Sequence, residues 1–450
     1  MKKLVDTIRN IFSIEELRTR ILNTLLLLVV YRIGTFVLLP GIDKGILDEL
    51  VAANPAKGLL GLIDTFAGGA FERASVFALG IMPYISASIV IQLLTVAVPA
   101  FQKMQKEGED GRRRINQITR YLTIAITAVQ AASYIINFQS TKSAAIVSSL
   151  SPTMFMISSI CVLVAGTMFT MWLGERITDR GLGNGISLII MVGIISRLPY
   201  SLGAEFLHKM ANNGGPIIFI MEMVFWLAVV LSVVLLVQGT RRIPVQYAKR
   251  IVGNRQYGGV RQYLPLKVNA AGVMPIIFAQ ALMFIPSSIA GFFPDSDTMQ
   301  GIIRSFVDYT SVGYNVIFFI MIVLFTYFYT AITINPNQIA DDLKRNGGFI
   351  PGVKPGKATA NFVDAIMSRI TLPGAIFLGF VSIFPAFAVL LGVNDQFAQF
   401  YGGTSLLIMV GVVLDTLSQI ESHLLMRHYD GLMKTGRLKG RTSTGGAITG

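Results

Sequence analysis

Long apolar runs alternate with short charged stretches along the whole chain. A helix needs about 20 mostly apolar residues to cross the hydrocarbon layer of a bilayer, and ten runs fit that requirement. The fifth is the least uniform, because Arg197 and Pro199 interrupt it. The predicted spans are residues 21–39, 76–98, 118–138, 153–173, 184–207, 216–238, 271–293, 314–334, 372–393 and 403–424. The pattern therefore predicts an all-α polytopic membrane protein with ten transmembrane helices.

Composition points to the same class. Of the 450 residues, 53% are apolar and 14% are charged, whereas about a quarter of the residues of a soluble domain are charged. So few charged residues cannot cover the surface of a water-soluble protein of this size. The single cysteine, Cys161, excludes an internal disulfide and a cysteine-based metal site within one chain.

Lysine and arginine indicate the orientation, because cytoplasmic loops carry an excess of these residues. With the N-terminus inside, the inner segments hold 30 of the 38 and the outer segments hold seven, with Arg32 inside the first span. We therefore expect both termini in the cytoplasm. The expected division is an amphipathic N-terminus (1–20), two halves (21–207 and 208–424) and a cytoplasmic tail (425–450).

A short motif occurs at matching positions of the two halves. The second span contains Gly80-Ile81-Met82-Pro83, and the seventh, which is the second span of the other half, contains Gly272-Val273-Met274-Pro275. Five spans in each half would place the halves in opposite orientations, and broken helices at matching positions of inverted halves indicate a transport path. The alternative is that glycine and proline are simply frequent in membrane helices.

The chain lacks the groups that an enzyme needs. Pro355-Gly356-Lys357 has neither the upstream glycine nor the following Ser or Thr of a nucleotide-binding loop. The three histidines form no metal-binding spacing with carboxylates, so we expect no metal or other cofactor. Glu222, Asp415 and Glu421 are the carboxylates expected within spans, which is sparse for an ion-coupled carrier. The sequence predicts a path across the membrane and not an enzyme.

Residues 58–71 form an apolar piece that is too short to span a bilayer and lies on the predicted outer side. Such a piece is either re-entrant or interfacial, and re-entrant backbone is tolerated where protein or a water-filled cavity surrounds it. Residues 58–71 fit a mobile segment that blocks a cavity. An interfacial helix on the outer leaflet is the alternative.

Two isoleucine pairs stand at helical spacing beside glycines. Ile81 and Ile85 share one face of the second span, and Ile186 and Ile190 share one face of the fifth. A ring of branched apolar side chains could form a constriction that excludes water and ions. Isoleucines that face lipid or fill a core would show the same spacing.

Two inner loops are long and basic. Residues 239–270 contain seven Lys and Arg and no acidic residue, and residues 335–371 contain five. The cations of the first loop are Arg241, Arg242, Lys249, Arg250, Arg255, Arg261 and Lys267. Membrane topology explains part of this excess. The length of the first loop and its lack of acids favour docking of RNA or of an acidic protein.

Several long motifs, in order over nearly the whole chain, resemble the SecY family, the central subunits of bacterial protein-conducting channels. They include FALGIMPYISASIVIQLL at 77–94, KEGEDGRRRINQITRY at 106–121, MWLGERITDRGLGNGISLII at 171–190, RRIPVQYAKR at 241–250, LPLKVNAAGVMP at 264–275, NPNQIADDLKRNGGFIPGVKPG at 335–356 and GGTSLLI at 402–408. Motifs of this length and order are highly specific to one family.

The resemblance implies two inverted five-helix halves around an hourglass pore, with a re-entrant plug helix at about 59–71. The implied pore ring is Ile81, Ile85, Ile186, Ile190, Ile277 and Ile408. The implied plug residues are Leu62, Ile63, Phe66, Gly68 and Gly69. Spans two and three against seven and eight form the implied lateral gate, with Gln92 and Asn269 as its polar residues. The implied docking residues are Arg241, Arg242, Lys249, Arg250, Arg255, Lys354 and Lys357.

The resemblance also implies the function and the partners. It implies translocation of unfolded secretory proteins across the bacterial inner membrane, with lateral release of apolar segments into the lipid. The implied partners are the SecE and SecG subunits, the SecA motor ATPase, and the ribosome through its RNA and protein. Lys354 and Asn254 stand where the family often has arginine, and lysine keeps the charge but loses bidentate geometry. A small-solute secondary transporter with inverted repeats is the alternative function.

Overall fold

The computed structural model describes residues 14–53, 59–147, 151–211, 215–247, 250–252, 255–257, 261–290 and 308–435. Helices make up most of the described chain. In the first half they are α2 (Glu15–Gly34), α3 (Lys44–Ala53), α4 (Leu59–Phe66), α5 (Met82–Ala97), α6 (Pro99–Lys106), α7 (Glu109–Thr141), the 3-10 turn η1 (Ser143–Ala145), α8 (Pro152–Arg180) and α9 (Gly185–Ala211). In the second half they are α10 (Gly215–Gln238), α11 (Met274–Ala290), α13 (Val312–Thr333), α14 (Pro336–Arg345), α15 (Lys357–Leu390), α16 (Asp395–Ala398) and α17 (Gly403–Thr435).

Among these described residues, seven helices are long and apolar enough to cross a membrane, or eight if α5 and α6, which meet at a 98° bend, form one broken span. The other two predicted spans fall on α2 and α11. Charged side chains near both ends of α2 limit its apolar length, and α11 has 17 residues. The structure therefore has a helix at each of the ten predicted positions, while the length and composition of two of them fall short of a complete span.

Both repeated motifs fix the start of a helix. Gly80 and Gly272 have positive φ angles of 54° and 64°, which favour glycine. The helix then begins two residues later in each case, at Met82 in α5 and at Met274 in α11, with proline as its second residue. Proline is well tolerated in the first helical turn, where its missing N–H has no partner to lose. Residues 76–81, expected to be helical, are instead irregular.

The first span ends earlier than predicted. α2 stops at Gly34, and residues 37–39 run extended beside the segment that follows α4. Val76 N–H donates to the carbonyl of Val37 at 2.8 Å, and Leu39 N–H donates to the carbonyl of Ala74 at 3.0 Å. The chain therefore exchanges helical hydrogen bonds for contacts with residues that lie 35 and 39 positions away in sequence.

The two basic loops are structured, which the hydropathy pattern did not predict. The strands β1 (Thr240–Tyr247), β4 (Arg261–Lys267) and β5 (Gly348–Phe349) form an antiparallel sheet in the order β4-β1-β5, and β2 (Arg250–Val252) pairs with β3 (Arg255–Tyr257). α15 begins 15 residues before the predicted span. The sheet, α14 and the start of α15 share one apolar core that includes Ile243, Val245, Leu343, Ile350 and Val363.

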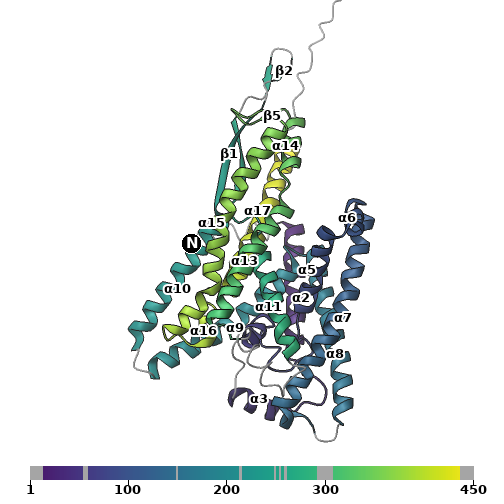
Figure 1. The fold of residues 1–450 in the computed structure, drawn as a ribbon, viewed down its shortest axis with the longest axis vertical. Helices are drawn as coiled ribbons and strands as arrows, with labels where there is room; N and C mark the ends of the chain where they lie inside the picture. Colours follow the sequence, from purple (N-terminus) through teal and green to yellow (C-terminus); the bar gives the residue numbers. More distant parts are fainter. Residues whose placement is uncertain are drawn as a thin grey trace, which may run out of the picture.

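The two long basic loops lie together at one end of the molecule. Figure 1 shows β1, β5 and α14 at the upper end of the view, α6 lower down at the top of α7, and α3 at the lower end. The purple and blue helices α5, α7 and α8 lie on one side, and α10, α15 and α17 lie on the other. α11 packs against α5 and α7, and α17 packs against α9, so these contacts join the two sides.

Truncation of Ile243 tests whether the sheet and helices of this end form one packed body. Ile243 is 3% exposed, and a buried Ile→Ala change costs about 2–5 kcal/mol. We expect Ile243→Ala to reduce the hydrogen-exchange protection of α14 as well as that of β1 and β4 by that free energy. Tyr263→Ala on β4 is the control, because Tyr263 is 59% exposed. Equal loss in both variants would contradict a shared core.

Candidate functional site

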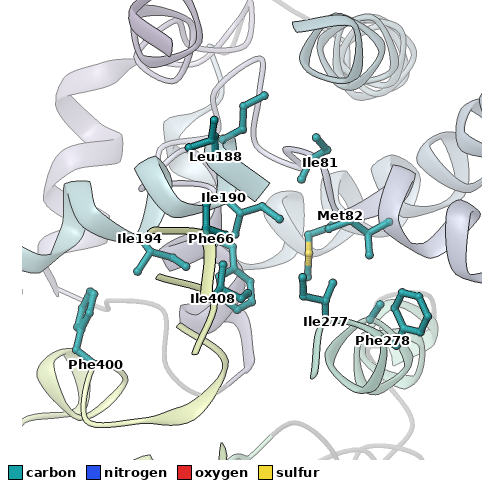
Figure 2. Packing of buried hydrophobic residues seen from close by; sticks show 14 of the residues in the cluster. Phe66, Ile81, Met82, Leu188, Ile190, Ile194, Ile277, Phe278, Phe400 and Ile408 are labelled. Atoms are coloured by element: carbon teal, nitrogen blue, oxygen red, sulfur yellow. The ribbon is translucent and has the colours of Figure 1, made fainter. Parts of the chain in front are cut away.

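The six predicted ring isoleucines come together in one hydrophobic cluster at the centre of the molecule. They approach from four places: the start of α5, the first turns of α9, the first turn of α11 and the second turn of α17. Five are between 1% and 6% exposed, and Ile186 is half-buried against the same cluster. Figure 2 shows Ile190, Ile277 and Ile408 around Phe66 and Met82. The structure therefore brings together all six isoleucines that the sequence analysis assigned to one ring.

α4 inserts into this cluster from the side of the predicted outer loops. Phe66, its last residue, is 6% exposed and belongs to the same cluster. Leu62 and Ile63 also lie in α4, and their side chains lie outside the described residues. Residues 67–81 then return to α5 without forming a helix, and hydrogen bonds within the segment and to α4 pair many of their backbone N–H groups. For example, Gly69 N–H donates to the carbonyl of Asp64 at 2.8 Å.

Glycines permit α4 to lie against α9. Gly68 and Gly69 have φ angles of 65° and 89°, a region that favours glycine. A Cβ at Gly193 of α9 would overlap the backbone carbonyl of Phe66, so the two backbones are in direct contact there. The predicted plug residues are therefore seated on α9 through backbone contact as well as through the Phe66 ring.

Charged side chains bind the segment around α4, and none of them is among the site residues predicted from the sequence. Arg197 of α9 forms ion pairs with Asp64 and Glu72. Arg32 Nη1 of α2 donates to the carbonyl of Gly68 at 2.7 Å. An arginine inside a predicted span and an aspartate inside an apolar segment were the signals that could have suggested this pair.

The α16 region contacts the same segment. Thr65 Oγ1 donates to Gln399 Oε1 at 2.7 Å, and both side chains are buried. Trp226 Nε1 of α10 donates to the carbonyl of Phe400 at 2.7 Å. The segment is therefore held from both halves of the chain.

The predicted gate residues lie near the boundary between α5 and α11 but do not pair. Gln92 of α5 is half-buried, and its side chain donates to Ser88 Oγ at 3.2 Å. Asn269, five residues before α11, is 5% exposed, and its Oδ1 has no hydrogen-bond partner. Within the described part of the chain no hydrogen bond joins Gln92 to Asn269.

The predicted docking cations lie at the end that carries the sheet. Arg241 and Arg242 of β1 are exposed, as are Lys354 and Lys357 at the start of α15. Arg250 and Arg255 begin β2 and β3, with their side chains outside the described residues, and Lys249 lies outside them altogether. Because β1 pairs with both β4 and β5, the fold places cations of both loops on one body.

A model of the SecY family matches residues 75–417. The chain belongs to the SecY family. Relatives named protein translocase subunit SecY are 42% identical in Halalkalibacterium halodurans, over 95% of this chain and 99% of the relative, and 41% identical in Streptomyces coelicolor, over 94% and 98%. The relative in Chlamydia trachomatis is 40% identical over 97% of this chain and 99% of its own.

Solved structures share the fold. A protein-conducting channel superposes with a TM-score of 0.66 at 19% identity, over 94% of this chain and 95% of the other. Sec61 in the canine ribosome-channel complex gives 0.62 at 17% identity over the same shares. With the long apolar helices, this SecY fold makes the chain a multi-pass membrane protein.

Substitution of Gly193 tests the backbone contact between α4 and α9. Overpacking costs about 1–3 kcal/mol, so Gly193→Ala should make local displacement of α4 roughly tenfold more frequent. The measurement is the rate at which a polar maleimide labels Ala67→Cys, a site 4% exposed, in purified Cys161→Ala protein. Gly203→Ala is the matched control, because nothing lies within 4 Å of a Cβ at that position of α9. Equal labelling rates would contradict the contact.

Proposed function

We propose that the chain is the pore-forming subunit of a protein-conducting channel. It translocates unfolded secretory proteins across the bacterial inner membrane and releases apolar segments sideways into the lipid. The observation that carries the proposal is the central cluster, in which isoleucines from four segments meet around Phe66 of α4. Membership of the SecY family and the translocase names of its relatives support it.

In this proposal the six isoleucines form the pore ring, and α4 with the turn after it is the plug. Branched apolar side chains give no hydrogen bonds to water and do not stabilise a passing ion, so the ring seals without a specific ligand. The same side chains can repack around an extended polypeptide. When α4 leaves, the ring becomes the narrowest part of the path.

The lateral gate is proposed between α5 and α7 on one side and α11 and α13 on the other, with Gln92 and Asn269 as its polar residues. Opening this boundary exposes the translocating chain to lipid. Leu, Ile, Phe and Val each gain about 0.3–0.6 kcal/mol at the centre of the bilayer, while Asp, Lys and Arg each cost about 2.5–3.5 kcal/mol. A run of roughly twenty apolar residues therefore leaves sideways, and a charged stretch passes through.

The proposed partners follow from charge and from the family. The basic body built from β1, β4, β5, α14 and the start of α15 is the proposed docking surface for the ribosome and for the SecA motor, with both chain termini in the cytoplasm. SecE and SecG are the proposed companion subunits. The similarity to a channel bound to a canine ribosome supports the ribosomal partner.

Trapping of a substrate at the ring tests the proposed function. Ile408→Cys in a Cys161→Ala chain should form a disulfide with an arrested secretory precursor that carries one cysteine, because Ile408 lies in the proposed ring. Leu231→Cys is the control, since Leu231 is 63% exposed and lies on α10, outside the proposed ring and gate. Absence of trapping at Ile408 with the precursor demonstrably arrested would reject the ring and favour the small-solute transporter.

The salt dependence of ribosome binding tests the docking surface. Each phosphate contact contributes about 0.7–0.9 to the slope of log affinity against log salt. We expect Lys354→Gln and Arg241→Gln each to lower that slope by about this amount, measured with purified ribosomes and the channel in nanodiscs. Lys142→Gln, beside η1 at the other end of the molecule, is the control. An unchanged slope for both test variants would reject docking on this surface.

A further inference from the structure

An ion pair connects α4, the proposed plug, to α9, a helix of the proposed pore wall. Asp64 stands in α4 and Arg197 stands in α9, 133 residues apart in sequence. The Asp64 side chain is 6% exposed and that of Arg197 is 20% exposed. Water therefore screens this pair far less than it screens the ion pairs at the surface, such as Arg20 with Glu16.

Asp64 has a second partner that fixes the shape of the following turn. Its Oδ1 accepts a hydrogen bond from Glu72 N–H at 2.8 Å, while its Oδ2 faces Arg197. The Glu72 carboxylate lies 3.4 Å from the same guanidinium. Arg197 therefore bridges the end of α4 and the turn that leads back to the pore wall.

Arg32 holds the same segment from a different helix. It donates to the carbonyl of Gly68 at 2.7 Å and to Thr35 Oγ1 at 3.4 Å. A Cβ at Gly68 would lie 2.8 Å from Arg32 Nη1, so a larger residue would push this arginine away. Arg32 of α2 and Arg197 of α9 thus bind the plug segment at Gly68 and at Asp64.

Removal of α4 from its seat would separate Asp64 from Arg197. A buried charge that loses its partner is strongly destabilised, whereas the same charge in water is well solvated. Displacement of α4 therefore passes through a state in which both ions have lost their partner before water solvates them. This state is a barrier to opening that the apolar contacts of Phe66 alone would not impose.

We propose that the Arg197–Asp64 ion pair is a latch that holds the plug in the closed channel and breaks each time the channel opens. This inference rests on the proposed function, because it assigns a role to the plug of a protein-conducting channel. Arg197 is a positioning residue in this proposal: it acts through the plug and does not need to touch the translocating chain.

The test is a double-mutant cycle on the resting ion leak. The whole channel, with its companion subunits, is reconstituted in liposomes without substrate, and the four proteins are wild type, Asp64→Asn, Arg197→Gln and the double variant. Asn at position 64 keeps an acceptor for Glu72 N–H, so the turn is preserved. Each single variant should leak at least about tenfold more than wild type. The double variant should leak far less than the product of the two increases, because both changes remove the same interaction.

Two further variants serve as an intermediate case and as a control for non-specific effects of removing an ion pair. Arg197→Lys keeps the charge but loses the guanidinium fork, so its leak should fall between wild type and Arg197→Gln. Arg120→Gln is the matched control, because Arg120 forms a 2.7 Å ion pair with Glu175 between α7 and α8, where neither residue is part of the plug segment. Its leak should equal that of wild type.

Deletion of residues 60–70 separates failure of the latch from failure of the proposed function. If the deletion leaks but Asp64→Asn and Arg197→Gln do not, the latch is wrong and the channel stands. If the two increases multiply in the double variant, the residues act separately and the latch is again wrong. If the deletion does not leak and no precursor is trapped at Ile408→Cys, the proposed function itself fails.

Discussion

The irregular backbone of residues 67–81 needs hydrogen-bond partners, and this need determines where the neighbouring helices begin and end. Peptide groups at membrane depth that are not helical are tolerated where protein surrounds them. Here Ser75 N–H donates to the carbonyl of Ala70, Val76 N–H donates to that of Val37, and the Tyr134 hydroxyl donates to that of Phe71. The early end of α2 and the late start of α5 are both consequences, because each supplies or makes room for these bonds.

The central hydrophobic cluster and the charged contacts of α4 have different physical roles. The central cluster is non-directional and can repack, which suits a seal around chains of differing sequence. The contacts of Arg197 with Asp64 and of Arg32 with Gly68 are directional and depend on one position of α4. Hydrophobic contact therefore closes the proposed pore, and the charged contacts select the closed position.

Exposed apolar side chains and exposed cations lie on different parts of the described chain. Large apolar side chains are exposed along α2 and α10, as expected for contact with lipid or with membrane partners. The exposed cations Arg241, Arg242 and Lys354 lie on the sheet-bearing end, where the two loops share one apolar core. A rigid body of this kind offers its charges in a fixed arrangement, which long flexible loops would not.

Features that depend on local chemistry could be predicted from the order of the amino acids. Apolar length predicted the helix positions, and Gly80 with Pro83 and Gly272 with Pro275 predicted two interrupted helices, because their backbone preferences act within a few residues. The tertiary structure decided which distant groups meet: the isoleucines of four segments, the strands of two loops, and Asp64 with Arg197. Such contacts depend on how helices pack, and no local pattern specifies a partner 133 residues away.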